Sequence, residues 1–157
     1  MIDIRKKILE VLEQTHLMSL ATNDSNGPWV ADVIFIYDDN LNIYWMSDPE
    51  TRHSKAIQEN NKVAGSITHS TKSKEANFGI QFNGIAEQLE GVQFKLLVKH
   101  LVKRGYPKPK LSQAMKLLDG DCWYKLIPTR IGLIDEKHFG YDRQELDLQQ
   151  NNKLNRF

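Results

Sequence analysis

The sequence predicts a mainly β protein, a small barrel of six to seven mostly antiparallel strands with peripheral helices. Short apolar segments of strand composition recur along the chain, and turns of hairpin length rich in Asp, Asn and Gly join them. Such spacing favours antiparallel pairing. Helical periodicity is confined to the start of the chain, one short segment and a late insertion. Because free strand edges promote aggregation, we expect the strands to close into a barrel or to pair in a dimer.

The helices follow from the spacing of apolar residues and from turn chemistry. Residues 3–14 place their apolar side chains on one face, which predicts an amphipathic helix. A short helix is predicted over Pro49–Asn60, with Asp48 as its N-cap and Pro49 in the first helical position. A longer amphipathic helix is predicted over Gly91–Arg104, and a second short helix over Leu111–Leu118.

The strands are apolar or β-branched segments that end at turn residues. Within the fifth strand, Gly79 and Gly84 are expected to mark a bulge or the close approach of a neighbour. Pro128 is expected to separate the last two strands, because proline cannot donate to a ladder. In chain order the predicted strands are Met18–Thr22, Trp29–Tyr37, Asn42–Met46, Lys62–His69, Phe78–Leu89, Cys122–Ile127 and Arg130–Asp135.

Composition limits the class of protein. The 157 residues are expected to form one domain over residues 1–146, followed by a polar, flexible tail at 147–157. A formal net charge of +1 gives no reason to expect a nucleic acid or an anionic membrane as a partner. No apolar run approaches the roughly 20 residues of a membrane span, and the charged N-terminal segment is not a signal peptide. With a single cysteine and no metal-binding spacing of histidines, we expect a cytoplasmic protein without a metal site.

Hydroxyls and cations gather where the third strand ends and the short helix begins. The residues are Ser47, Thr51, Arg52 and His53. Unpaired N–H groups and the helix dipole favour an anion at such a terminus, and arginine can bind phosphate through two hydrogen bonds. This pattern indicates a phosphate site. The alternative interpretation is an ordinary capped surface helix with solvated charges.

Residues 51–64, TRHSKAIQENNKVA, resemble a motif of the pyridoxamine 5'-phosphate oxidase-like FMN-binding split barrels. In that motif a Ser/Thr-Arg-Lys/His step is followed by Ile, Asn-Pro and Val. A Gly-Pro-x-x-Ala strand at 27–31 precedes it and a glycine-containing strand follows, so the resemblance covers most of residues 1–135. The sequences GIQFNG at 79–84 and HFGY at 138–141 resemble most closely the bacterial group typified by YhbP (UPF0306).

The resemblance implies an FMN site and its residues. The phosphate-binding positions correspond to Ser47, Thr51, Arg52 and His53. Backbone groups of Ala31, Asp32 and Val33 would face the pyrimidine edge of the flavin ring. Members of the family bind FMN across a homodimer interface, so residues of the second subunit near Trp123 and Lys125 would complete the site.

Two departures from the family pattern limit what the resemblance implies. A basic residue that often reaches the phosphate from the second strand is absent, because the chain reads Ile-Phe-Ile at 34–36. Substrate contacts are often carried near His138 and residues 141–143. There the Arg-x-His signature of true pyridoxamine 5'-phosphate oxidases is replaced by Lys-His-Phe-Gly at 137–140, which argues against pyridoxamine phosphate as the substrate.

The sequence therefore predicts an FMN-binding flavoprotein, an oxidoreductase acting on a small molecule in a homodimer. A flavin performs its own redox chemistry, which agrees with the absence of an evident acid–base pair or nucleophilic triad. One alternative is a flavin-binding or redox-sensing module without dedicated turnover. Another is a split barrel adapted to haem or a deazaflavin, for which His53, His69 and His138 are the available imidazoles.

Two further patterns admit a structural and a functional interpretation. The tryptophans, at positions 29, 45 and 123, could stack on a flavin, but large aromatic residues favour core or interface packing. Lys95, Lys99 and Lys103 recur every fourth residue, with further basic residues nearby. This basic stripe could bind an anionic substrate, a nicotinamide nucleotide or nucleic acid. The favoured interpretation is the solvated face of an amphipathic helix.

Overall fold

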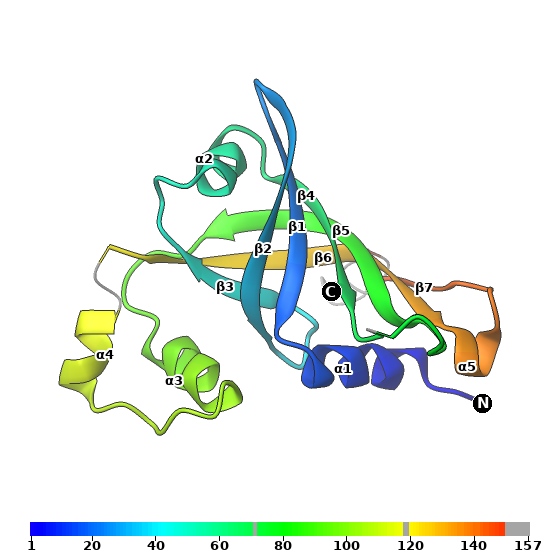
Figure 1. Cartoon of the computed structure of the whole chain (residues 1–157). Helices are drawn as coiled ribbons and strands as arrows, with labels where there is room; N and C mark the ends of the chain where they lie inside the picture. The colour runs from blue at the N-terminus through cyan, green and yellow to red at the C-terminus, as the bar shows by residue number, and fades with distance from the viewer. Residues whose placement is uncertain (71, 118–119, 150–157) are drawn as a thin grey trace, which may run out of the picture.

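A computed structural model of the chain describes residues 1–70, 72–117 and 120–149. Seven strands form one antiparallel sheet in the order β3-β2-β1-β4-β5-β6-β7, and an additional pairing of β3 with β6 closes six of them into a barrel (Figure 1). The predicted β-barrel with peripheral helices is therefore confirmed. The strands are β1 (Leu17–Asp24), β2 (Gly27–Tyr37), β3 (Ile43–Ser47), β4 (Lys62–Thr68), β5 (Phe78–Gln88), β6 (Cys122–Asp135) and β7 (Gln144–Asp147).

The barrel closes through pairings between residues far apart in the sequence. β1 and β2 form a hairpin in which Leu17 pairs with Ile34 and Asp24 with Gly27. β3 then leaves β2 and pairs along its whole length with the first five residues of β6, so that Ser47 lies opposite Cys122. The end of β3, where the predicted phosphate site begins, is thus held in place by β6.

A bulge in β6 lies beside Gly84. The register of β5 and β6 shifts there, with Asn83 opposite Arg130 and Gly84 opposite Pro128. A Cβ at Gly84 would lie 2.3 Å from the carbonyl oxygen of Ile127, so only glycine allows the strands to approach this closely. The predicted break at Pro128 is wrong. β6 continues through the proline because the bulge accommodates a residue that cannot donate to the ladder.

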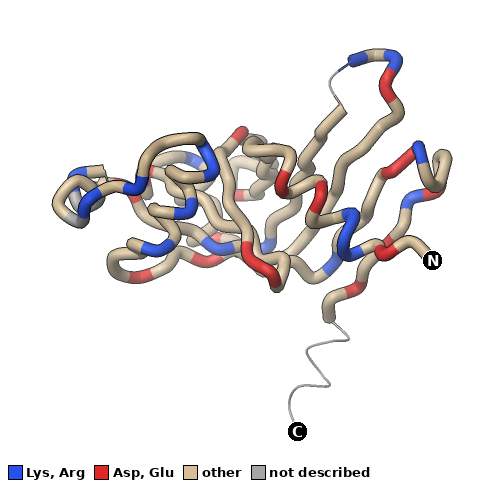
Figure 2. Tube along the Cα trace, turned by 90° about the horizontal axis from the view of Figure 1, so that it is seen from below, with Lys and Arg blue, Asp and Glu red and all other residues tan. Residues whose placement is uncertain are grey.

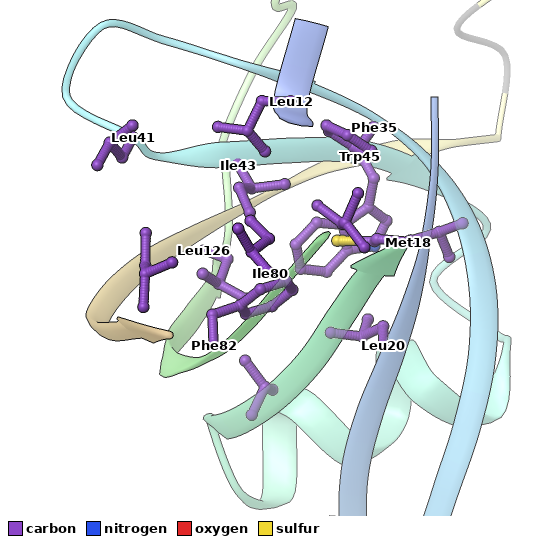
Figure 3. Packing of buried hydrophobic residues seen from close by; sticks show 14 of the residues in the cluster. Leu12, Met18, Leu20, Phe35, Leu41, Ile43, Trp45, Ile80, Phe82 and Leu126 are labelled. Atoms are coloured by element: carbon purple, nitrogen blue, oxygen red, sulfur yellow. The ribbon is translucent and has the colours of Figure 1, made fainter. Parts of the chain in front are cut away.

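Apolar side chains from every strand of the closed barrel fill its interior (Figure 3). Trp45 is fully buried there and stacks on Tyr124, with ring centroids 5.5 Å apart. Alternation along the strands explains this pairing, since opposite residues of paired antiparallel strands point to the same face. Trp45 therefore packs in the core, and its ring surface is not available to a cofactor.

Helices cover the barrel at its ends and on one side (Figure 1). α1 (Ile4–Gln14) buries Ile8, Val11 and Leu12 against the core. α3 (Phe94–Lys103) covers a second apolar cluster on the outer face of the barrel and is shorter at both ends than predicted. The remaining helices are α2 (Arg52–Glu59), α4 (Leu111–Leu117) and α5 (Glu136–Phe139). None of the described helices has the length and apolar character needed to cross a bilayer.

α2 begins later than predicted, at Arg52, with Thr51 as its N-cap. Asp48 is not the cap, because its carboxylate accepts the N–H of Glu50 at 2.8 Å and its carbonyl accepts the N–H of Thr51 at 3.1 Å. Residues 48–51 therefore form a turn closed by an aspartate side chain, a conformation that competes with helix.

The last strand crosses the predicted domain boundary at residue 146. β7 pairs with β6 and extends to Asp147, so residue 146 lies inside a strand. Leu148 packs against the core cluster. Of the predicted flexible tail, residues 150–157 lie outside the described residues.

Candidate functional site

A polar cluster joins the end of β3 to the first turn of α2. Ser47 Oγ lies 2.9 Å from His53 Nε2, and Thr51 Oγ1 lies 3.3 Å from the same nitrogen. Thr51 also donates to the carbonyl of Asp48 and shares a hydrogen bond of 2.8 Å with Ser54. The structure thus brings together three of the four predicted phosphate residues around one imidazole.

The N-terminus of α2 keeps its backbone donors available. Thr51 forms no side-chain cap and the first turn contains no acidic residue. Within the described residues, the N–H groups of residues 52–54 donate to no acceptor, whereas that of Lys55 donates to Thr51. Free N–H groups and the positive end of the helix dipole together form an environment that favours an anion.

His53 is half-buried, and burial lowers its pKa below the ordinary value of 6.5. The imidazole is therefore neutral at pH 7 and has one N–H and one acceptor nitrogen. Depending on the tautomer, its Nε2 either donates a hydrogen bond to Ser47 Oγ or accepts one from it. The cluster can donate hydrogen bonds to an anion, but His53 adds no positive charge at neutral pH.

Arg52 takes a different partner from the one that the sequence suggests. Its Nε lies 3.0 Å from Asp24 Oδ2 and its Nη2 lies 3.2 Å from Asp24 Oδ1, a bidentate ion pair across to the β1–β2 hairpin. The guanidinium also lies over the Trp29 ring, 4.6 Å from the centroid. The Arg52 guanidinium does not contact Ser47 or His53. The Asp24 carboxylate competes with any phosphate for the Arg52 guanidinium.

The predicted flavin-ring residues lie on a strand edge that has no partner. β2 pairs with β1 from Gly27 to Ile34, but it pairs with β3 only over residues 35–37. Along the other edge, backbone groups near Ala31, Asp32 and Val33 meet no strand in the described part of the chain. The Asp32 side chain accepts a hydrogen bond of 2.6 Å from Ser19, whereas Val33 points into the core.

Trp123 and Lys125 lie on the outer face of β6, because they pair with Met46 and Tyr44 of β3. Trp123 is only 2% exposed and packs with Ile36 and Leu97 under α3. A ligand held by a second subunit could reach its ring only if α3 moved away. The contribution predicted for these two residues in a dimer stays a prediction.

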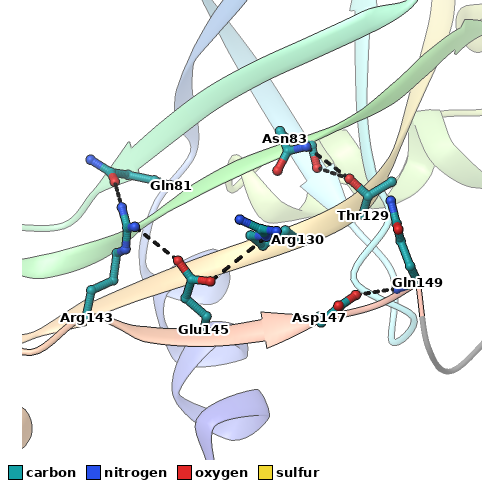
Figure 4. Close-up of polar contacts among 8 residues, drawn as sticks. All are labelled: Gln81, Asn83, Thr129, Arg130, Arg143, Glu145, Asp147 and Gln149. Carbon is teal, nitrogen blue, oxygen red and sulfur yellow. Dashed lines mark hydrogen bonds and ion pairs between the residues drawn. The ribbon is translucent and has the colours of Figure 1, made fainter.

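The segment after β6 carries a second oriented histidine. His138 Nδ1 lies 2.8 Å from both carboxylate oxygens of Asp135, whose side chain is almost fully buried. This contact fixes the orientation of the ring and leaves Nε2 free. Nearby, Arg143 donates to Gln81 and Glu145, each at 3.0 Å, across the outer face of the sheet (Figure 4).

The sequence model of the pyridoxamine 5'-phosphate oxidase family matches residues 4–132. The chain belongs to this family. A UPF0306 protein of Pasteurella multocida is 29% identical over 131 residues, which cover 83% of this chain and 87% of the relative. The similarity confirms the predicted likeness to the UPF0306 group within the pyridoxamine 5'-phosphate oxidase family.

Solved structures with the same fold have diverged widely in sequence. A conserved protein, Rv2991, of Mycobacterium tuberculosis superposes with a TM-score of 0.79 at 13% identity, covering 95% of both chains. HutZ, the heme storage protein of Vibrio cholerae, superposes with a TM-score of 0.65 at 16% identity, covering 93% of this chain and 95% of that one. These similarities show the split-barrel fold of the pyridoxamine 5'-phosphate oxidase family alone.

The sequence patterns did not identify Asp24 and Asp135. Their carboxylates orient Arg52 and His138, respectively. Asp24 falls in a run of turn residues, and its carboxylate accepts the N–H of Asn26 as expected for a turn. The same carboxylate binds Arg52, 28 positions away. For Asp135 a local signal existed, since Asp and His three residues apart can meet on one helical turn.

Proposed function

We propose that the protein binds FMN and acts as a cytoplasmic oxidoreductase on a small molecule. The observation that carries the proposal is the cluster of Ser47, Thr51 and His53 at the uncapped N-terminus of α2. It supplies hydroxyl, imidazole and backbone donors at one place, which is the donor set of a phosphate site. Membership of the pyridoxamine 5'-phosphate oxidase family supports a flavin as the phosphate ester.

The residues of this cluster supply the hydrogen-bond donors that a phosphate needs. They supply less positive charge than a typical phosphate site. Ser47 and the first-turn N–H groups of α2 would hold the phosphate, and Arg52 would add charge only by turning from Asp24. The unpaired edge of β2 offers backbone groups to the ring. When bound, the flavin supplies the redox chemistry, and the protein contributes binding, orientation and electrostatics.

A comparison of FMN with riboflavin tests the phosphate assignment, because the two differ only in the phosphate. We expect the protein to bind FMN about tenfold or more tightly than riboflavin, the effect of at least one charge-assisted hydrogen bond. Quenching of flavin fluorescence measures both affinities. Ser47→Ala should reduce the preference, whereas Ser66→Ala, which removes a hydroxyl on β4, should not. Equal affinities for the two flavins would refute a phosphate clamp formed by Ser47, Thr51 and His53, called the clamp below.

A redox function requires a further measurement. We expect NADH or NADPH to reduce the bound flavin faster than free FMN under the same conditions. A protein that binds FMN with this preference but shows no acceleration would be a flavin-binding or redox-sensing module. The two assays thus separate the cofactor from its use.

The free edge of β2 also supports a homodimer. Val30 and Trp29 on this strand are 60% and 43% exposed, and an apolar, unpaired edge is normally covered by another chain. Light scattering coupled to size exclusion measures the oligomeric state. We expect a dimer for the native chain and a monomer for Val30→Lys, while Lys74→Ala, a change in the β4–β5 connection, leaves the dimer intact.

A second candidate ligand is haem, and the Asp135–His138 pair favours it. Metal-binding histidines usually donate the other ring nitrogen to a carboxylate, as His138 can to Asp135. A neighbour in fold, HutZ, is a heme storage protein. Titration with hemin distinguishes the candidates: a Soret band that shifts on binding and is lost in His138→Ala would support haem. The two visible bands of bound flavin in the purified protein would support FMN.

A further inference from the structure

A cavity of about 720 Å3 lies between α1, β2 and α3. Ile34 and Tyr37 of β2 line it, together with residues of α1, α3 and the segments that follow these two helices. Ser47, Thr51 and His53 are not among the residues that line it, so the cavity is separate from the clamp.

Three cations reach the cavity from consecutive turns of α3 and from its C-cap. Lys99 donates to the carbonyl of Tyr37, and its ammonium lies 5.0 Å from the centre of the Tyr37 ring. Lys103 donates to the carbonyl of Leu12 at 2.6 Å and lies 4.5 Å from the Phe35 ring. Arg104 completes the group. Figure 2 shows how basic residues gather in this part of the chain.

Within the described part of the chain, the positive charges that line this cavity outnumber the negative ones. Among the described residues, no carboxylate forms an ion pair with Lys99, Lys103 or Arg104. Glu13 is the acidic residue that lines the cavity, and its carboxylate accepts a hydrogen bond from the Tyr37 hydroxyl. Three cations and one carboxylate give the lining an excess of two positive charges.

The structure agrees only in part with the favoured interpretation of the basic stripe as a solvated helix face, because Lys95 and Lys99 are exposed whereas Lys103 is half-buried. Lys99 folds toward β2 and Lys103 toward α1, and Lys103 loses part of its hydration. Burial, together with a smaller effect of Lys99, lowers the pKa of Lys103 to about 8, and Glu13 only partly opposes this. An anion in the cavity would stabilise the charged forms of both lysines.

We propose that this cavity binds a small dianionic oxyanion, a phosphate monoester or a dicarboxylate, through Lys99, Lys103 and Arg104. The charge of the ligand matches the excess of the lining, and Ile34 and Val102 provide apolar surface for its carbon skeleton. A purely structural explanation also exists, because Lys103 binds a carbonyl in the last turn of α1, which contains no basic residue of its own. The two explanations differ in whether the native protein binds an anion.

Backbone amide NMR of the full chain tests the proposal, with inorganic phosphate and succinate as separate probes at constant ionic strength set by chloride. We expect saturable shifts at residues that line the cavity, and the tighter probe identifies the preferred oxyanion. A double variant, Lys99→Gln with Lys103→Gln, removes both charges but keeps amide donors for the two carbonyls. It should bind the preferred probe about tenfold or more weakly. Lys95→Gln removes an exposed charge from the same helix and should change the affinity less than about twofold.

Three results would overturn the proposal. The first is linear, non-saturating shifts with both probes in the native protein, which would leave Lys103 with its structural contact alone. The second is an equal loss in the double variant and in Lys95→Gln, which would indicate unspecific attraction. The third is loss of FMN binding in the double variant, which would make the cavity the flavin phosphate site instead of a separate site for a small oxyanion, and would refute the clamp as well. If the double variant keeps FMN binding but loses anion binding, the result supports two separate sites.

Discussion

Replacing Lys103 by methionine should change how the stability of the protein depends on pH. The side chain keeps its length but loses its ammonium, which donates to Leu12 and lies over Phe35 in the native protein. Burial lowers the pKa of Lys103 from 10.5 to about 8. Between these pH values the unfolded chain binds the lysine proton while the folded chain releases it, so the free energy of unfolding of the native protein rises with pH.

The size of the effect follows from the two pKa values. From pH 7 to pH 10 the lysine alone would raise the free energy of unfolding by about 2.5 kcal/mol, at 1.36 kcal/mol for each unit of pKa shift. Because the ammonium is only partly buried, solvent screening reduces this to about 1–2 kcal/mol. Below about pH 7 the lysine is protonated in both states, so the free energies of unfolding of the native protein and the variant should change with pH in parallel.

Urea unfolding at intervals between pH 7 and pH 10 measures the effect as the difference between native protein and Lys103→Met. The difference cancels groups that titrate in both proteins, including Tyr44, whose pKa is raised to about 12. Lys95→Met serves as the control on the same helix and should leave the profile unchanged. A difference between native protein and Lys103→Met that stays flat from pH 7 to pH 10 would refute a buried, charged lysine at this position.

Two further predictions address the barrel and the clamp. Gly84→Ala should lower the free energy of unfolding by about 3 kcal/mol, because its Cβ would meet the backbone of Ile127 at 2.3 Å. Gly132→Ala, whose Cβ would meet only the flexible side chain of Arg143, should cost less than about 1 kcal/mol, and equal costs in urea unfolding would contradict the bulge geometry. Asp24→Asn should free the Arg52 guanidinium and tighten FMN binding severalfold in a fluorescence titration. An unchanged affinity would show that this cation does not reach the phosphate.

Local sequence patterns predicted most of the secondary structure, and they failed where two local preferences compete. At residues 48–51 both an N-cap and an aspartate turn were possible, and the carboxylate of Asp48 closes the turn. At Pro128 the missing N–H argued for a break in the strand. The strand continues because its neighbour offers Gly84, which lets the two backbones come together at a bulge.

Within the candidate site, too, local sequence accounts for some contacts and only the tertiary structure accounts for others. Ser47, Thr51 and His53 are within seven positions of one another, so a strand, a turn and a helix are enough to bring them together. Arg52 belongs to the same motif, but its guanidinium can reach several places. Its partner Asp24 is 28 positions away, and the hairpin that carries it is placed by the barrel.

The sequence by itself determined the strand order along the chain, the hairpins and the polar first turn of α2, because these depend on side-chain periodicity and turn chemistry over a few residues. Only the tertiary structure decided the closure of β3 on β6 and the partners of the long cationic side chains. Periodicity tells which face of a helix is polar and does not tell what that face meets. The sequence therefore indicated solvated lysines on α3. Because α3 packs beside β2 and α1, two of these lysines instead line a positively charged cavity.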